Sequence, residues 1–200
     1  MRSGSRTLGI AFSDAESTSY VAGAVVRTDG TLDGLAFDSC TIGGTDATDA
    51  ILALFDGLGR EDVRRVVCAG IAPAWFNVVD LHRLHAELDR PVLSVSYEAS
   101  PGLEPALRRE FDGEALFDRL TAYRSLPPRR RVRRDGPAED DSAENDGSPE
   151  RAPLFVRSVG IDDDRARDVV RRLTREGFRR PEPLRVASIA AGAHRRVVGG

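Results

Sequence analysis

The sequence predicts an α/β protein whose mixed five-stranded sheet has the strand order 3-2-1-4-5 and is flanked by helices. Two observations lead to this fold class. Three strand-like segments come first with short connections, which favours an antiparallel meander. Helical and strand patterns then alternate, as they do where parallel strands are joined by crossover helices. A chain of 200 residues is long enough to bury one substantial core, so we expect a single domain over residues 1–200.

The three predicted meander strands cover residues 7–12, 20–28 and 32–42, which are rich in apolar and β-branched side chains. The last two are joined at Asp29 and Gly30, a pair typical of tight hairpin turns. The meander is therefore predicted from both composition and turn chemistry.

The alternating part begins after Gly43 and Gly44, where Thr45 is a suitable helix N-cap. A buried strand is expected at residues 66–69 and a helix from Asn77, because apolar residues then recur at helical spacing. Further strands are expected at 91–97 and 154–159, each followed by charged or helical segments. Three meandering strands followed by helix, strand, helix and strand are the order of the ribonuclease H-like fold.

A change of composition interrupts this pattern at about residues 129–150. A basic run, RRRVRR, is followed by an acidic run that contains almost no apolar side chains. Such a segment cannot bury enough surface to offset its ordering entropy, so we expect a disordered insertion within the domain. The basic run can hold a nucleic-acid backbone, but the acidic run beside it can equally neutralise it.

Composition excludes several function classes. The net charge is −3, so no global basic field indicates a nucleic-acid-binding protein, and the 29 basic residues are all arginine, which excludes lysine-based catalysis. No apolar run is long enough to span a bilayer, and the first residues lack the apolar region of a signal peptide, so we expect a cytoplasmic protein. Cys40 and Cys68 lie in apolar strands about three strand spacings, or roughly 14 Å, apart, where they are expected to be buried thiols without a disulfide or a zinc ion.

Four pieces of the chain carry a family resemblance: GGTDATDAI before the first helix, GIAPAWFNVVD, RPVLSV and PEPLRVASIAAG. They resemble the archaeal endonuclease dU family, which is similar to endonuclease V and is assigned to the ribonuclease H-like fold. The resemblance covers nearly the whole chain outside the charged insertion. It implies a phosphodiester hydrolase that acts on deaminated or damaged DNA or RNA with Mg²⁺ or Mn²⁺.

The resemblance also implies two metal-binding aspartates, one on the first strand and one at the end of the fourth. This sequence has Ala11 and Ala69 at those positions, and Ser188 where relatives tend to have histidine. Two-metal hydrolysis needs oxygen ligands, and alanine supplies none. The chain therefore departs from the family at the residues on which its chemistry depends.

Neighbouring acids are candidates to replace them. Asp14 follows the first strand and Asp46 opens the first helix, so both are candidate metal ligands, and with Asp80 they are the candidate catalytic residues. Each also has a structural interpretation, because an aspartate suits a loop or the first turn of a helix.

Candidate nucleic-acid contacts are Trp75, Phe76 and Asn77, together with Arg185 in the last of the family-like pieces. The two aromatic rings can stack on an extruded base or simply pack within the turn. Two hypotheses follow for the whole protein. It is a metal-dependent endonuclease with relocated acids, or a catalytically inactive relative that serves as a nucleic-acid-binding or protein-interaction module.

Overall fold

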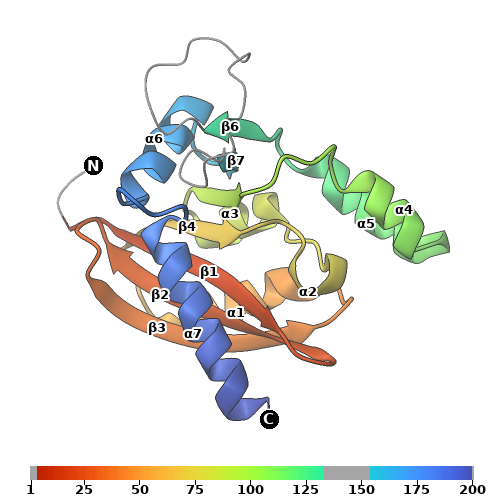
Figure 1. Cartoon of the computed structure of the whole chain (residues 1–200), viewed down its shortest axis with the longest axis horizontal. Helices are drawn as coiled ribbons and strands as arrows, with labels where there is room; N and C mark the ends of the chain where they lie inside the picture. Colours follow the sequence, from red (N-terminus) through yellow and green to blue (C-terminus); the bar gives the residue numbers. More distant parts are fainter. Residues whose placement is uncertain (1–3, 133–153, 200) are drawn as a thin grey trace.

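The computed structural model describes residues 4–132 and 154–199 and consists of one seven-stranded sheet with helices on both faces (Figure 1). The strands are ordered β3-β2-β1-β4-β5-β7-β6. In chain order the elements are β1 (Arg6–Asp14), β2 (Thr18–Arg27), β3 (Leu32–Thr41), α1 (Ala47–Leu58), β4 (Val63–Ala69), α2 (Pro73–Phe76), α3 (Leu81–Leu88), β5 (Val92–Ser96), α4 (Glu104–Glu110), α5 (Gly113–Ser125), β6 (Arg130–Val132), β7 (Leu154–Val159), α6 (Asp163–Leu173) and α7 (Glu182–Val198).

The predicted strand order is confirmed, but the predicted number of strands is wrong. β1, β2 and β3 form the antiparallel meander, and β4 and β5 join β1 in parallel. β7 then pairs antiparallel with β5 and carries β6 on its other edge. The sheet therefore continues two strands beyond the expected five, because the strand-like segment at residues 154–159 extends the sheet.

The start of the predicted insertion is also corrected. Residues Arg130 to Val132 form strand β6, and Val132 is fully buried opposite Leu154 of β7. Arg130 on the same strand pairs with Asp163 at the start of α6, with 2.7 Å between Nε and Oδ2. One buried valine among arginines is enough to anchor a short edge strand. The rest of the predicted insertion, residues 133–150, lies outside the described residues.

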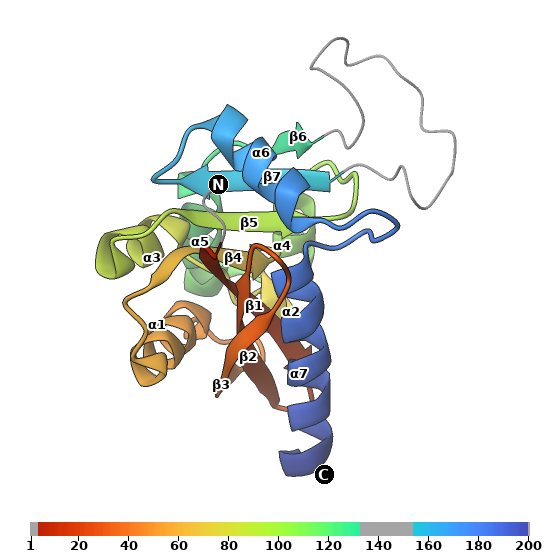
Figure 2. The ribbon, with the colours of Figure 1, turned by 90° about the vertical axis from the view of Figure 1, so that its left-hand side faces the viewer.

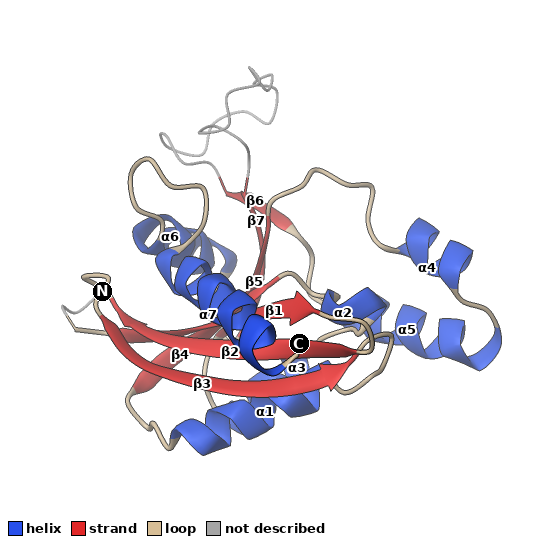
Figure 3. Cartoon of the chain, turned by 60° about the horizontal axis from the view of Figure 1, so that its bottom comes forward, coloured by secondary structure: helices blue, strands red, loops and turns tan. Residues whose placement is uncertain are grey.

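Each face of the sheet is covered by its own helices (Figures 2 and 3). Alternation along the strands divides the side chains, so Leu8 and Ile10 of β1 join the core beneath α1 and α3. Val67 and Leu93 point to the opposite face, where α6 and the start of α7 cover them. The sheet is thus buried on both sides along its central strands.

Helix α7 approaches β1 and β2 closely because small residues line the contact. Ala187 of α7 packs against Ala11 and Ala24 of the sheet, and all three are buried. At Gly9 an added Cβ would come 2.3 Å from the backbone of Pro183, so only glycine fits there. This close packing fixes α7 along β1 and sets its polar residues near the carboxyl end of that strand.

The connection between β4 and α3 differs from the expected helix start at Asn77. Helix α3 begins at Leu81, and Asp80 is its N-cap residue. Before it, Ala74, Trp75 and Phe76 have φ angles of 48°, 55° and 61°, so α2 is a left-handed turn. The apolar spacing that suggested a helix from residue 77 belongs to a loop up to Asp80.

Two helices, α4 and α5, form a pair beside the carboxyl ends of the strands, in a charged segment for which no secondary structure was predicted. Both cysteines are buried and free, as expected. Burial raises the pKa of each thiol to about 12, which keeps both protonated. In the part of the chain that the structure describes, no helix combines the length and apolar composition that crossing a membrane requires.

Candidate functional site

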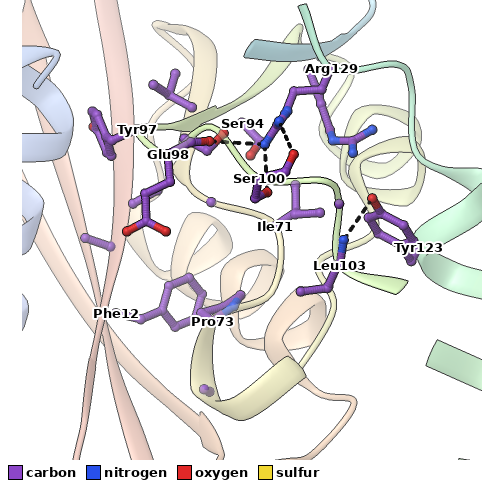
Figure 4. A pocket seen from close by; sticks show the side chains of 18 of the residues that line it. Phe12, Ile71, Pro73, Ser94, Tyr97, Glu98, Ser100, Leu103, Tyr123 and Arg129 are labelled. Carbon is purple, nitrogen blue, oxygen red and sulfur yellow. Dashed lines mark hydrogen bonds between the residues drawn. The ribbon is translucent and has the colours of Figure 1, made fainter. Parts of the chain in front are cut away.

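A pocket of about 710 Å³ lies at the carboxyl ends of β1, β4 and β5 (Figure 4). Ligands of open α/β sheets bind at this edge. The loop that follows β5 forms one wall, and α5 and α7 contribute Tyr123 and Ser188.

Ala11 and Ala69 both line this pocket. They lie side by side on neighbouring parallel strands, because Ile10 and Cys68, the residues before them, are the last Cα partners of β1 and β4. Ala11 is only 1% exposed and Ala69 is half-buried, both against the small-residue cluster that includes Ala187. Two methyl groups therefore stand at the sheet edge where the family resemblance implied two aspartates, and Ser188 faces the same pocket.

Two carboxylates line the pocket, Asp14 and Glu98. Asp14 is the last residue of β1, not a loop residue, and accepts a 2.6 Å hydrogen bond from the Ser19 hydroxyl. Glu98 was missed by sequence reasoning, although it lies two residues after the end of β5, and β5 is parallel to β4, so its position at the sheet edge was available from the topology. Figure 4 shows its side chain directed toward the side of the pocket where Phe12 lies.

Three arginines line the pocket, Arg129, Arg157 and Arg180. Sequence reasoning pointed only to Arg129, as the first residue of the basic run that can hold a nucleic-acid backbone, and missed the other two. Arg129 donates to the Ser100 carbonyl at 2.8 Å and to the Ser100 hydroxyl at 3.2 Å. Arg157 donates to the Pro127 carbonyl, and Arg180 to the Ser188 hydroxyl at 3.4 Å. Among the described residues, none of the three forms an ion pair, so their charges are held by neutral partners.

Aromatic side chains complete the walls. The guanidinium groups of Arg179 and Arg180 lie 5.8 and 5.4 Å from the centroid of the Tyr97 ring. Burial raises the pKa of Tyr97 to about 12 despite these two cations, so the phenol is neutral. The Tyr123 hydroxyl accepts a 3.1 Å hydrogen bond from the Leu103 amide, which ties the loop after β5 to α5.

Asp46 and Asn77 lie together, outside the pocket lining. The Asn77 amide donates to Asp46 Oδ1 at 2.7 Å and to the Thr41 carbonyl at 3.0 Å, and its Oδ1 accepts from the Ala47 amide at 2.9 Å. Burial raises the pKa of the Asp46 carboxyl, but hydrogen bonds from Asn77 and Thr41 outweigh burial and hold the pKa below its ordinary value. Asn77 is fully buried, so in this structure its side chain is held within the protein and is not presented to nucleic acid.

Asp80 and Arg185 have local structural partners. The Asp80 carboxylate accepts hydrogen bonds of 3.0 Å from the amides of His82 and Arg83, as an N-cap residue does. Arg185 donates to both carboxylate oxygens of Glu182 at 2.8 and 2.7 Å within α7. Neither lines the pocket, and of the three candidate catalytic acids only Asp14 does.

Trp75 and Phe76 stand on the left-handed turn next to Ala74, which lines the pocket. Trp75 is 55% exposed, whereas Phe76 is half-buried. Their rings meet edge to face with centroids 5.5 Å apart. The two residues, which the sequence analysis treated as a pair, therefore differ in how far they are exposed to solvent.

The residues at this edge do not fit a two-metal centre. Hard cations such as Mg²⁺ need several oxygen ligands, and the pocket offers Asp14 and Glu98 beside the methyl groups of Ala11 and Ala69. Among the described residues, no group of three histidine, cysteine, aspartate or glutamate side chains could hold a metal ion. The site is cationic and aromatic rather than carboxylate-rich.

Comparisons with known proteins agree with the fold. A solved protein of unknown function from Archaeoglobus fulgidus superimposes with a TM-score of 0.76 at 22% identity, covering 94% of this chain and 97% of that one. Endonuclease V of Ciona intestinalis, solved with a 24mer DNA that contains inosine, superimposes with a TM-score of 0.61 at 11% identity, covering 98% and 87%. The chain therefore has the fold that endonuclease V also has.

The sequence comparisons identify the family. A UPF0215 protein of Thermococcus kodakarensis is 35% identical over 156 residues, which are 76% of this chain and 69% of that protein. The family model described as Endonuclease dU matches residues 3–195. The chain belongs to the Endonuclease dU family, as its sequence motifs predicted.

Proposed function

We propose that this chain is a nucleic-acid-binding member of the Endonuclease dU family that does not cleave phosphodiester bonds by two-metal chemistry. The observation that carries the proposal is the composition of the pocket. Ala11 and Ala69 form its edge where metal ligands would be needed, while Arg129, Arg157 and Arg180 line it without ion pairs among the described residues.

The three pocket arginines support polyanion binding because their hydrogen-bond partners are neutral oxygen atoms rather than carboxylates. A guanidinium group matches phosphate oxygens in a bidentate geometry, and its charge stays on at any physiological pH. Elsewhere in the described chain many arginines face carboxylates, such as Arg83 with Glu87 and Arg108 with Glu104. The pocket arginines instead donate to carbonyl and hydroxyl oxygens, which orient them but leave their charge available to a phosphate.

The comparison with endonuclease V supports the ligand class. The Ciona intestinalis protein, which shares the fold, was solved in complex with DNA containing an inosine. A protein with this fold can therefore bind nucleic acid. The local charge of the pocket, rather than the net charge of −3, is what would attract the strand.

A second candidate is a metal-dependent endonuclease acting on deaminated or damaged nucleic acid. The observation that favours it is the placement of Asp14 and Glu98, two carboxylates on the lining of the same pocket. In this version they, and not Asp46 or Asp80, would share a Mg²⁺ or Mn²⁺ ion. The candidate needs oxygen ligands beyond these two, which water or the nucleic acid would have to supply.

One set of measurements separates the two candidates. Fluorescence anisotropy with single-stranded and duplex DNA and RNA, with and without uracil or inosine, is run in EDTA and in Mg²⁺ or Mn²⁺, and the same samples are examined for nicking. Binding in EDTA with intact strands in every buffer is the expected result. Metal-dependent nicking that disappears in the Asp14→Asn, Glu98→Gln double variant would establish the endonuclease and overturn the proposal.

A further inference from the structure

Trp75 is presented to solvent by an unusual turn. It is 55% exposed and belongs to α2, which lies just beyond the carboxyl end of β1 (Figure 3). Its φ angle and those of its two neighbours, Ala74 and Phe76, are all positive. Non-glycine residues rarely adopt this region, at a cost of about 1–2 kcal/mol each, and strained residues of this kind cluster at binding sites.

The strained turn is held in place from both sides. The Gly43 amide donates to the Ala74 carbonyl at 2.7 Å, and the Asn77 amide donates to the Pro73 carbonyl at 2.9 Å. The buried Asn77 side chain then ties the end of the turn to Asp46 and to the start of α1. These contacts over-determine the backbone, so the strain is built into the native structure.

Aromatic packing beneath the turn fixes its side chains. Phe76 lies edge to face with Phe111, with centroids 5.8 Å apart, and the Arg119 guanidinium is 4.1 Å above the Phe111 ring. Arg119 in turn donates to the carbonyls of Gly43 and Gly44. Phe76 is thus the anchor of the turn, and Trp75 is the ring left exposed above it.

We propose that Trp75 is a stacking platform for an unpaired base of a single-stranded nucleic acid. The inference rests on the proposed function, because the strand would be held by the pocket arginines while one base reaches the indole. Its neighbours Pro73 and Ala74 line the pocket, so Trp75 directly follows the pocket wall in the chain. Stacking on an indole tolerates any base, since every base has a π face. The site therefore selects for unpaired bases rather than for a sequence.

The chain contains a single tryptophan, so tryptophan emission, excited selectively over that of the three tyrosines, reports on this ring alone. Titration of the full-length protein with a single-stranded oligonucleotide should quench the Trp75 emission, and an abasic oligonucleotide of the same length should bind more weakly without quenching. Trp75→Ala should weaken the anisotropy-measured affinity by roughly 5- to 150-fold, the effect of one stacked base. Trp75→Phe should retain most of the affinity.

Phe117→Ala is the matched control, because Phe117 is another exposed aromatic residue, on α5, with 68% of its surface accessible. It should leave the affinity unchanged. If the wild-type protein binds the oligonucleotide but its emission is unaffected and Trp75→Ala binds equally well, the stacking platform is refuted and the proposed function stands. If the wild-type protein binds none of the nucleic acids, the proposed function fails and this inference with it.

Discussion

The Asn77 side chain donates a 2.7 Å hydrogen bond to Asp46, and with it joins the end of β3, the start of α1 and the turn before α3. Both residues belong to family-like motifs, and both had been candidates for direct contact with a metal ion or nucleic acid. Their hydrogen bond indicates that these two residues support the site indirectly. They hold in place the turn that carries Trp75 and the helix that begins at Ala47.

Asn77→Ala is expected to destabilise the protein by about 3 kcal/mol. The change leaves the Ala47 amide and the Thr41 carbonyl without their partner, and each unsatisfied buried group costs about 1–3 kcal/mol. Urea unfolding at neutral pH measures the loss. Asp80→Ala, which removes only the cap of α3, should cost about 1 kcal/mol. Equal losses in the two variants would contradict a special role for Asn77.

Asp46 should make stability depend on pH in the acid range. Its pKa is lower in the folded protein than the ordinary 3.8, so its contribution is fully present above the unfolded pKa and is lost as the pH falls through the folded pKa. Asp46→Asn is expected to be less stable than wild type by about 1–2 kcal/mol at pH 6, because hydrogen bonds to a charged acceptor are lost. The gap between the two proteins should narrow as the pH falls below 3.8 and through the lower folded pKa, as followed by urea unfolding. A gap that is constant from pH 6 to pH 2 would assign the effect to shape rather than charge.

Gly9→Ala should separate α7 from the sheet. The added methyl group would come 2.3 Å from the Pro183 backbone, which cannot move without shifting the helix, so we expect a loss of about 3 kcal/mol in the free energy of unfolding. Gly57→Ala is the matched control, because no atom lies within 4 Å of a Cβ there and alanine favours a helix. It should stabilise the protein by up to about 1 kcal/mol. Thermal unfolding of the two variants side by side checks both signs.

The double variant Ala11→Asp, Ala69→Asp should acquire affinity for divalent metal. Two adjacent carboxylates at the sheet edge repel one another, so we expect the variant to be less stable than wild type in EDTA. Mn²⁺ at 100 times its dissociation constant should then restore about 2.7 kcal/mol. Calorimetric titration and unfolding in Mn²⁺ measure this, with the wild-type protein expected to show no stabilisation. An equal response of wild type would mean that its own acids already bind the ion.

Arg180→Gln should weaken binding of single-stranded DNA and flatten its salt dependence. One lost phosphate contact reduces the slope of log K against log salt by about 0.7. Arg165→Gln removes the same charge from α6, where Arg165 is 81% exposed and pairs with Asp162, so it serves as the control. Its slope should match that of wild type. Equal effects of the two variants would show that total charge, not the pocket, governs binding.

Much of the fold was predictable because it depends on local patterns. The meander and the alternating helices follow from apolar periodicity and turn residues, and these gave the confirmed order from β3 to β5. β6 was missed because one buried residue, Val132, lies within a run of arginines that reads as solvated charge. The left-handed turn at Trp75 was missed because its backbone is imposed by partners far away in sequence, among them Gly43.

The features of the site also fall into those that the sequence predicts and those that depend on tertiary contacts. The sequence by itself determined the family, the edge of the sheet where a site would form and the absence of acids at Ala11 and Ala69, because each of these is a matter of residue type at a position in a motif. Only the tertiary structure decided which side chains surround those alanines. Arg129, Arg157, Arg180 and Glu98 come from separate segments, and their convergence depends on how β5, β7 and α7 pack. Packing is a property of the whole chain, so no single motif could reveal that Ala11 and Ala69 line a pocket together with three arginines.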